Sequence, residues 1–286
     1  MIVNHKHKQI PVPDILTTIP DAPESLFAIG DTLNELLKKP RIAIVGSRKM
    51  TPYGRLVTEK FASELAGKGI VIVSGLAYGV DACAHQTALT SGGKCIAVLA
   101  CGLDQMYPAA NKKLADNIVE KGGVILSEYP KKTEPLRHHF LARNRIISGL
   151  ADAVLITEAA QRSGSLNTSG HALNQGMPVM AIPGNINSLM SGGTNNLIKS
   201  GAHLISEVSD VLSILKLDED SSQQSLPVAL SKEEYIILSL LKEGISDGLE
   251  LQTKSDLDPA MYGQTLTMLE ISGKVKPLGN NKWAIS

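Results

Sequence analysis

Six unbroken apolar runs, separated by stretches with helical spacing, dominate the chain between residues 41 and 210. The runs are 41–47, 70–75, 94–100, 124–127, 153–157 and 178–182. Strands that are apolar along their whole length are buried on both faces, and the intervening helices supply the crossovers that parallel strands need. The pattern therefore predicts an α/β fold, namely a Rossmann-like doubly wound domain with a mainly parallel sheet.

The sequence predicts four segments. Residues 1–40 are an N-terminal extension that packs on the core, and residues 41–215 form the Rossmann-like domain. Residues 216–229 are polar and acidic, which is typical of a flexible linker. Residues 230–286 contain two stretches of helical periodicity and then a hairpin signal at Gly279-Asn-Asn. Helices followed by a hairpin favour a small C-terminal winged-helix domain.

Charge is spread unevenly along the chain, although the formal net charge is zero. Residues 41–210 hold 17 Lys and Arg against 12 Asp and Glu, whereas residues 230–286 hold 6 against 8. The central segment, and not the C-terminal one, is therefore the candidate for binding an anionic partner.

The three cysteines, Cys83, Cys95 and Cys101, lie in apolar elements and lack the spacing of metal ligands. We therefore expect buried free thiols and no metal site, which suits a reducing cytoplasm. The N-terminus lacks the apolar segment of a signal peptide, and no apolar run reaches the length of a membrane helix. We expect a cytoplasmic protein with no membrane partner.

Four polar or glycine-rich motifs follow the predicted strands, at the edge where ligands of open α/β sheets bind. Glycine lets backbone amides approach a ligand, serine and the N-terminus of a helix bind phosphate oxygens, and arginine adds a bidentate fork. An aromatic face can stack on an unpaired base. The candidate ligands are Gly46, Ser47 and Arg48; Ser74, Gly75, Ala77 and Gly79; Phe140, Arg143, Asn144 and Arg145; and Ser163, Gly164, Ser165 and Thr168.

Each motif also has a purely structural explanation. The glycine-serine motifs can be ordinary strand-to-helix turns or helix caps, and Arg48 can be a solvated surface charge. Arg143 and Arg145 can form salt bridges with Glu128 or Glu158, and the nearby aromatic ring can belong to the core. The coincidence of four such motifs at one sheet edge favours a site for a polyanionic strand.

The catalytic and cofactor motifs that are usual for this fold are absent from the sequence. No Gly-x-Gly-x-x-Gly follows the first run, and Ser74-Gly75 stands where a dinucleotide-binding protein places a ribose-binding acid. There is no phosphate-binding P-loop and no Gly-x-Ser-x-Gly elbow. We therefore expect a binding protein without a cofactor, and not an enzyme.

Several strings carry a family resemblance, in order, along residues 10–215. They include Ile44-Val-Gly-Ser-Arg48, Ser74-Gly-Leu-Ala-Tyr-Gly-Val-Asp81, Tyr107-Pro108 with Asn111, Ser127-Glu-Tyr-Pro130, Arg143-Asn-Arg-Ile-Ile147, Ser163-Gly-Ser-Leu166 with Thr168, and Ile182-Pro-Gly184. In these residues the chain resembles the DprA/Smf family, the DNA-processing proteins A of bacterial natural transformation.

The resemblance implies a protein that binds single-stranded DNA, loads the RecA recombinase onto that DNA, and forms a homodimer through the Rossmann-like domain. Arg48 is similar to the principal strand-binding arginine of the family, and Arg143 and Arg145 match its Arg-Asn-Arg run. Lys112 or Lys113 lies where the family tends to place another basic contact.

Two alternatives remain open. A nucleotide-binding Rossmann-like hydrolase, similar to phosphoribohydrolases, would carry a Pro-Gly-Gly-x-Gly-Thr loop with a catalytic Glu nearby. This chain has Pro183-Gly-Asn-Ile and, separately, Ser191-Gly-Gly-Thr. A winged helix at the C-terminus would suggest binding of duplex DNA. The acidic balance of that segment and the lack of Lys and Arg in residues 259–272 favour a protein contact instead.

Overall fold

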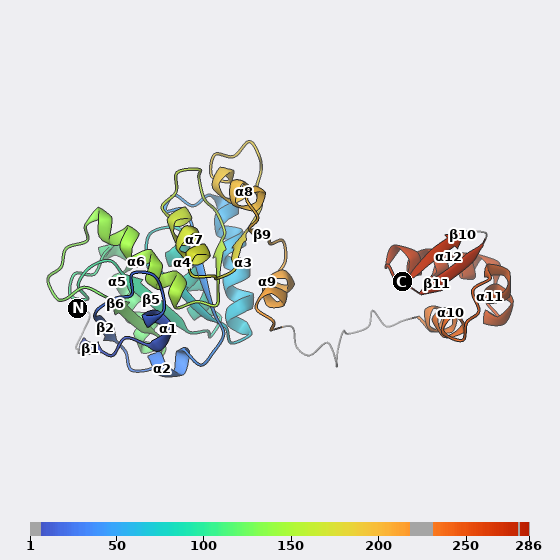
Figure 1. The fold of residues 1–286 in the computed structure, drawn as a ribbon, viewed down its shortest axis with the longest axis horizontal. Helices are drawn as coiled ribbons and strands as arrows, with labels where there is room; N and C mark the ends of the chain where they lie inside the picture. Colours follow the sequence, from blue (N-terminus) through green and yellow to red (C-terminus); the bar gives the residue numbers. More distant parts are fainter. Residues whose placement is uncertain (1–6, 218–230, 280, 286) are drawn as a thin grey trace. The chain divides into compact units, whose positions relative to one another are not determined.

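A mostly parallel sheet organises the first part of the molecule (Figure 1). The computed structural model describes residues 7–217, 231–279 and 281–285, and within them nine strands join in the order β1-β2-β6-β5-β4-β3-β7-β8-β9. The strands are β1 (Lys8–Ile10), β2 (Leu26–Ile29), β3 (Arg41–Val45), β4 (Val71–Ser74), β5 (Cys95–Leu99), β6 (Val124–Ser127), β7 (Ala153–Ile156), β8 (Val179–Ala181) and β9 (His203–Leu204). The order reverses between β3 and β7, as in doubly wound folds.

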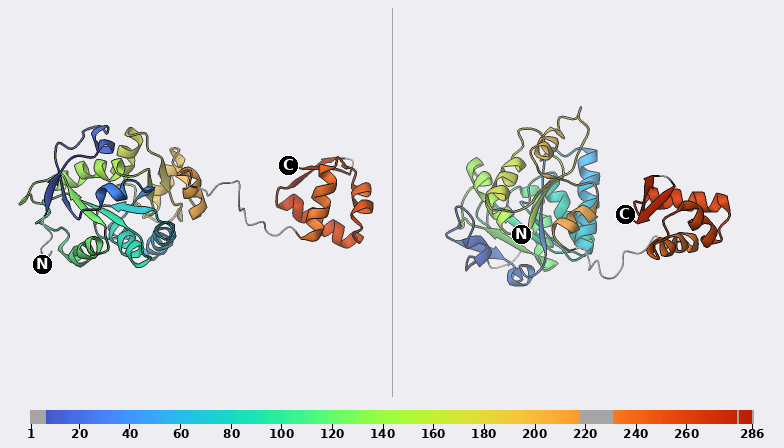
Figure 2. Two further views of the ribbon diagram at one scale, coloured as in Figure 1. Left: turned by 90° about the horizontal axis from the view of Figure 1, so that it is seen from below. Right: turned by 45° about the vertical axis from the view of Figure 1, so that its right-hand side comes forward.

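Helices cover both faces of this sheet (Figure 2). They are α1 (Asp14–Thr17), α2 (Leu33–Leu36), α3 (Pro52–Gly67), α4 (Val80–Thr90), α5 (Lys112–Glu120), α6 (Arg137–Gly149), α7 (Ser165–Asn174), α8 (Gly192–Lys199) and α9 (Val208–Ile214). Ile42 and Ile44 of β3 belong to a core cluster that includes residues of α3, α4, α5 and α9, whereas Ala43 and Val45 belong to a second cluster that includes residues of α1, α2, α6 and α7. Alternate residues of one strand thus enter two cores, and the predicted Rossmann-like fold is confirmed.

The N-terminal segment extends the sheet, which the sequence did not predict. Strand β1 pairs antiparallel with β2, and β2 pairs antiparallel with β6, with Phe27 opposite Ser127. Strand β1 is Lys-Gln-Ile, which forms no apolar run, and the sequence indicated only a segment packed on the core. The chain therefore enters the parallel sheet through two antiparallel strands, of which β1 is the edge.

A second unit follows. The chain divides into Met1–Asp218 and Glu219–Ser286, and most of the predicted linker lies outside the described residues. The second unit contains α10 (Lys232–Lys242), α11 (Gly248–Ser255), α12 (Pro259–Ile271) and a hairpin of β10 (Val275–Gly279) and β11 (Lys282–Ile285). Helix α11 was not predicted, although Asp247 caps it by accepting from the N–H groups of Leu249 and Glu250. The winged-helix assignment stays a prediction.

None of the helices in the described ranges has both the length and the apolar character that crossing a membrane requires.

Arg145 of α6 joins three parts of the first unit. Its guanidinium forms a two-point salt bridge with Glu128, at 3.0 and 2.7 Å, and its Nε donates to the carbonyl of Asp21 at 2.6 Å. Both side chains of the pair are nearly buried. A buried charge whose partner is removed is strongly destabilising, because no water replaces the lost contacts. Arg145 therefore ties α6 to the end of β6 and to the N-terminal segment.

Replacement of this arginine tests its structural role. We expect Arg145→Met to lower the free energy of unfolding by about 3–5 kcal/mol, since Glu128 would stay buried without a partner. The double variant Arg145→Met/Glu128→Leu should recover most of the loss in denaturant titrations. A single variant within about 0.5 kcal/mol of the parent protein would show that the pair contributes little.

His85 of α4 gives the first unit a pH dependence. Its side chain is completely buried, and burial lowers the pKa of the imidazole from 6.5 to about 4. Between these values the unfolded chain binds a proton that the folded chain does not, so stability falls as the pH drops. We expect a loss of about 2 kcal/mol from pH 7 to pH 5 from this group alone.

Chemical denaturation at both pH values measures this effect. His85→Gln should lose about 2 kcal/mol less than the parent protein between pH 7 and pH 5, whereas the exposed His203→Gln serves as the matched control. Equal losses in the parent protein and in His85→Gln would contradict the assignment.

Candidate nucleic-acid interface

A cleft of about 830 Å³ opens where the strand order reverses. Ligands of open α/β sheets bind at this position, outside the carboxyl ends of the strands. The predicted site residues that line the cleft are Gly46, Ser47, Arg48, Ala77, Phe140, Arg143, Asn144, Ser163, Gly164, Ser165 and Thr168. The fold therefore brings together residues from four separate segments of the chain.

Glu158, after β7, fixes the first loop of the cleft. Its carbonyl accepts from the N–H of Ser47 at 2.8 Å, and its carboxylate accepts from the N–H and hydroxyl of Thr51. Thr51 in turn caps α3 by accepting from the N–H of Gly54, as the sequence predicted. These contacts hold the loop in place and leave the side chain of Arg48 exposed to solvent.

An aromatic pair supports Arg48. The guanidinium carbon of Arg48 lies 4.9 Å from the ring centroid of Phe140, and that ring meets the exposed ring of Tyr107 edge-on at 5.5 Å. A cation above an aromatic face is attracted by the ring quadrupole. Phe140 is half-buried, and its ring is occupied by Arg48 in the free protein. Tyr107 therefore offers the more accessible aromatic surface for a ligand.

Arg143 lies beneath the floor of the cleft. It is 4% exposed, and one guanidinium nitrogen donates to the carbonyls of Gly75, at 2.8 Å, and Val98. Burial lowers its pKa to about 10, and the neighbouring carboxylate of Asp81 opposes that shift. Burial likewise raises the pKa of Asp81, while Arg143 lowers it. Arg143 is therefore a fixed positive charge inside the protein at neutral pH.

Glycine is required beside this buried charge. A Cβ atom on Gly75 would lie 2.6 Å from the guanidinium of Arg143. Gly79 has a φ of 77°, and a Cβ there would lie 2.2 Å from the carbonyl oxygen of Ser47. Both glycines thus serve the packing of the loop that precedes α4.

The third loop begins α7 at the cleft. The hydroxyls of Ser163 and Ser165 are 2.7 Å apart, and the amide of Asn144 donates to Asn167 at 3.2 Å. Thr168 is buried in the first turn of the helix. The N-terminal turn of α7 therefore lines the cleft, although the N–H groups of Leu166 and Asn167 already donate to the carbonyls of Ser163 and Gly164. The positive end of the helix dipole at this turn favours anions.

Some predicted site residues lie elsewhere. Arg145 does not line the cleft. Its guanidinium forms an ion pair with Glu128, so its charge is not available to a ligand. Ser74 is buried and donates to the carbonyl of Ile44 at 2.7 Å. Lys112 lines a neighbouring hollow that also contains Tyr107, and Lys113 is exposed on α5 outside both.

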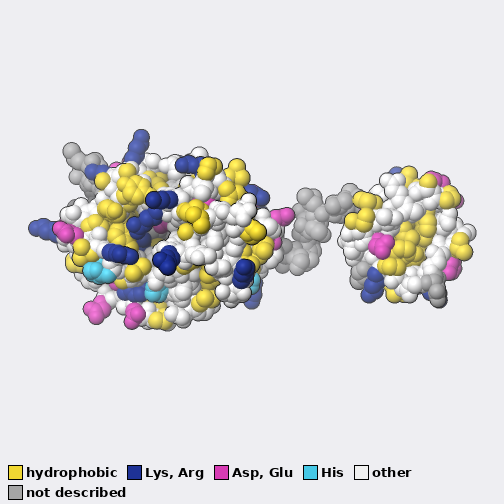
Figure 3. Space-filling model, turned by 90° about the horizontal axis from the view of Figure 1, so that it is seen from above, with side chains coloured by type: hydrophobic (Ala, Val, Ile, Leu, Met, Phe, Trp, Pro, Cys, Tyr) yellow, Lys and Arg dark blue, Asp and Glu magenta, His cyan; other side chains and the backbone are white. Residues whose placement is uncertain are grey.

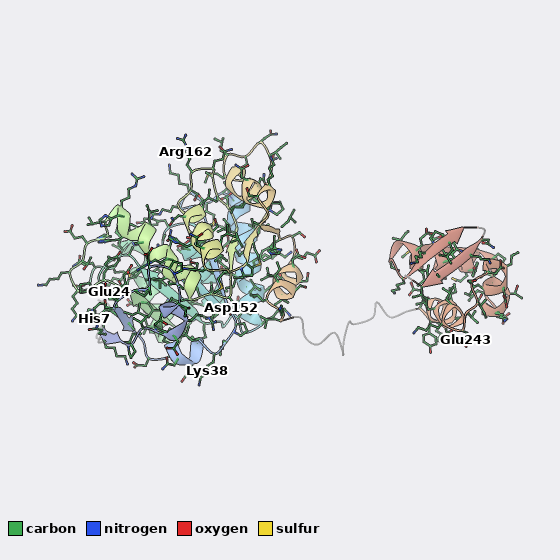
Figure 4. All side chains as sticks on the ribbon, viewed as in Figure 1. His7, Glu24, Lys38, Asp152, Arg162 and Glu243 are labelled. Atoms are coloured by element: carbon green, nitrogen blue, oxygen red, sulfur yellow. The ribbon has the colours of Figure 1, made fainter. Side chains whose placement is uncertain are left out.

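Three further cations of the cleft were not among the predicted ligands. Lys49, Arg137 and Arg162 are exposed, line the cleft, and join Arg48 around its opening. Figure 3 looks onto this side of the first unit and shows Lys and Arg side chains gathered around a hollow. Arg162 projects from it into solvent in Figure 4. Lys49 and Arg162 are next to predicted motifs in the sequence, and Arg137 begins the helix that carries Arg143. This proximity in sequence could have identified them as candidate ligands.

The exposed charges around the cleft are all positive. No ion pair joins its four exposed cations to a carboxylate among the described residues. The acidic side chain that lines it is the buried Asp81, which accepts from the N–H of Gly75 at 3.1 Å. Within the described ranges, no group of three or more His, Cys, Asp and Glu could hold a metal ion. The arrangement can therefore hold a polyanion by its phosphates.

Known proteins share this architecture. The family model described as DNA recombination-mediator protein A matches residues 2–216. DNA processing protein DprA of Streptococcus pneumoniae is 48% identical over 197 residues, which are 69% of this chain and 68% of that protein. The putative DNA processing protein DprA of Mycobacterium tuberculosis is 35% identical over 270 residues, 92% of this chain and 69% of that protein.

DNA processing protein A from Helicobacter pylori has a solved structure that was described for its single-stranded DNA binding mode. This chain superposes on it with a TM-score of 0.68 at 37% identity. The alignment covers 75% of this chain and 98% of that one. The family match includes every strand of the nine-stranded sheet and every side chain of the cleft. The chain therefore belongs to the DNA recombination-mediator protein A family, the DprA/Smf family.

Proposed function

We propose that this protein binds single-stranded DNA in the cleft and acts as a recombination mediator without cutting the strand. One observation carries the proposal: four exposed cations, Arg48, Lys49, Arg137 and Arg162, surround a cleft whose acidic side chain is buried. Guanidiniums bind phosphate oxygens at two points, and exposed aromatic rings stack on unpaired bases. The single-stranded DNA binding mode of the relative from Helicobacter pylori supports this assignment.

The wider role follows from family membership. We infer that the bound strand is handed to the RecA recombinase during natural transformation, and that two copies associate through the Rossmann-like domain. The three free cysteines are buried, which suits the reducing cytoplasm in which such a strand would arrive. A hydrolase is the less favoured function. The acidic side chain that lines the cleft, Asp81, is buried beside Arg143 and accepts a hydrogen bond from the N–H of Gly75, so it is poorly placed to act as a catalytic acid or base.

Arg48 offers the most direct test of strand binding. We expect Arg48→Ala to weaken binding of a single-stranded oligonucleotide about tenfold, because one charge-assisted phosphate contact is lost. The slope of log affinity against log salt should fall by about 0.7, since fewer counterions are released. Fluorescence anisotropy at several salt concentrations measures both quantities.

Lys68 provides a matched control for Arg48. It is also an exposed cation, but it follows the C-terminal end of α3, at the opposite edge of the sheet. Lys68→Ala should keep the affinity and the salt slope of the parent protein. If Arg48→Ala and Lys68→Ala behave alike, phosphate contact at the cleft is ruled out.

We propose a protein-contact role for the second unit. Helix α12 carries one charged side chain, Glu270, and presents Met261, Met268 and Ile271 to solvent. A helix that reads a DNA groove needs basic and polar side chains along its exposed face.

Removal of the second unit tests this role. A chain that ends at Leu215 should bind duplex DNA as the full chain does, to within about twofold, in gel-shift titrations, because residues 230–286 hold more acidic side chains (8) than basic ones (6) and α12 holds no Lys or Arg. A large loss of duplex affinity would assign DNA binding to the second unit.

A further inference from the structure

The loop between β8 and α8, residues 183–191, exposes two large aliphatic side chains. We call it the rim loop. Ile186 is 90% exposed and Leu189 is 87% exposed, more than any other large hydrophobic side chain of the described residues. Isolated exposed aliphatics are common on proteins, but two within four residues, almost fully in water, form a local apolar surface.

The rim loop is held in this shape by hydrogen bonds at its base. The hydroxyl of Tyr53 donates to the carbonyl of Pro183 at 2.6 Å. The amide of Asn195 contacts Gly184 twice, accepting from its N–H at 3.1 Å and donating to its carbonyl at 3.0 Å. Within the loop, backbone hydrogen bonds join Ser188 to Asn185 and Ser191 to Ser188. These contacts fix the loop in a conformation that leaves both aliphatic side chains unburied.

The rim loop borders the cleft. Met190 lines the cleft together with Arg162, and Figure 1 shows the segment before α8 standing above the same edge of the sheet. Tyr107 belongs to the loop after β5, and β5 is separated from β8 by β4, β3 and β7. Neighbouring strands lie about 4.8 Å apart, so the two loops are roughly 19 Å apart along the cleft. A strand that enters over Tyr107 would leave over the rim loop.

The composition of the rim loop suits contact with bases better than contact with phosphates. Residues 183–191 contain no charged side chain. The cations of the cleft hold the backbone of the strand, which leaves unpaired bases with free apolar faces. Leucine and isoleucine side chains insert between the base steps of a duplex only by unstacking and kinking it, at a cost of about a few kcal/mol per step. In a single strand the bases are unpaired and less firmly stacked, so the same apolar contact costs less.

We propose that Ile186 and Leu189 form an apolar wedge that contacts and unstacks nucleobases where a single strand leaves the cleft. The inference rests on the proposed function, because it needs a strand in the cleft. It adds a second kind of contact to that function: the cations supply affinity for any polyanion, and the wedge adds preference for unpaired DNA. The wedge thereby discriminates single strands from duplexes.

The double variant Ile186→Ser/Leu189→Ser tests the wedge in the full chain. Anisotropy titrations with a single-stranded oligonucleotide should show about tenfold weaker binding at every salt concentration, with the salt slope of the parent protein. This pattern differs from that of Arg48→Ala, whose slope falls. Affinity for a duplex of equal length should not change. Single-stranded oligonucleotides with 2-aminopurine at successive positions report unstacking, and the variant should lose the fluorescence rise at the position beside the loop.

Two control variants separate the wedge from general effects. Leu249→Ser removes an exposed leucine of the second unit and should bind like the parent protein. Ile186→Leu/Leu189→Ile keeps the apolar volume and should restore both affinity and the 2-aminopurine signal. Thermal unfolding of each variant checks that the fold is retained.

Three outcomes would overturn the wedge. The first is a serine double variant that binds and unstacks single strands like the parent protein. The second is a serine double variant whose oligomeric mass changes in native mass spectrometry while its single-strand affinity and 2-aminopurine signal stay those of the parent protein. This result would assign the rim loop to an interface between copies. The third is a parent protein that binds no single-stranded DNA at any salt concentration, which would remove the proposed function and the wedge together.

Discussion

The buried guanidinium of Arg143 is the contact on which the geometry of the cleft depends. It joins the ends of β4 and β5 by donating to the carbonyls of Gly75 and Val98, and its guanidinium carbon lies 5.9 Å from the centroid of Phe140. Phe140 then supports Arg48 at the surface. One buried charge, partly balanced by Asp81, therefore positions the aromatic ring and the exposed cation above it. The floor of the cleft is positive before any ligand arrives.

The strand order explains why the site lies where it does. Reversal between β3 and β7 separates the helices that follow these strands, and the loops after both strands open toward the resulting gap. Glu158 closes the base of the gap by bonding to the backbone of Ser47 and Thr51. The surrounding cations then face solvent without carboxylate partners in the described part of the chain, so their charge is available to a polyanion.

Sequence patterns predicted the parallel sheet, because its strands are apolar throughout, and the start of α3, because Thr51 and Pro52 are a strong capping signal. The sequence patterns did not show whether the arginines of the Arg-Asn-Arg run bind a ligand or form ion pairs within the protein. The two arginines lie two positions apart on one helix, and tertiary contacts send Arg143 under the cleft and Arg145 to Glu128. The antiparallel strands β1 and β2 were not predicted: β1 is Lys-Gln-Ile, which forms no apolar run, and β2 is a single run of four residues outside the repeated alternation of strands and helices.

Photochemical crosslinking tests most directly whether a single strand lies in this cleft. An oligonucleotide that carries 5-bromouracil at successive positions would be irradiated with the full chain, and the modified peptides would be identified by mass spectrometry. We predict crosslinks at Tyr107, Phe140 and the segment around Arg162, which line one cleft. Crosslinks confined to residues 231–285, or to the edge of the sheet that carries Lys68, would contradict it.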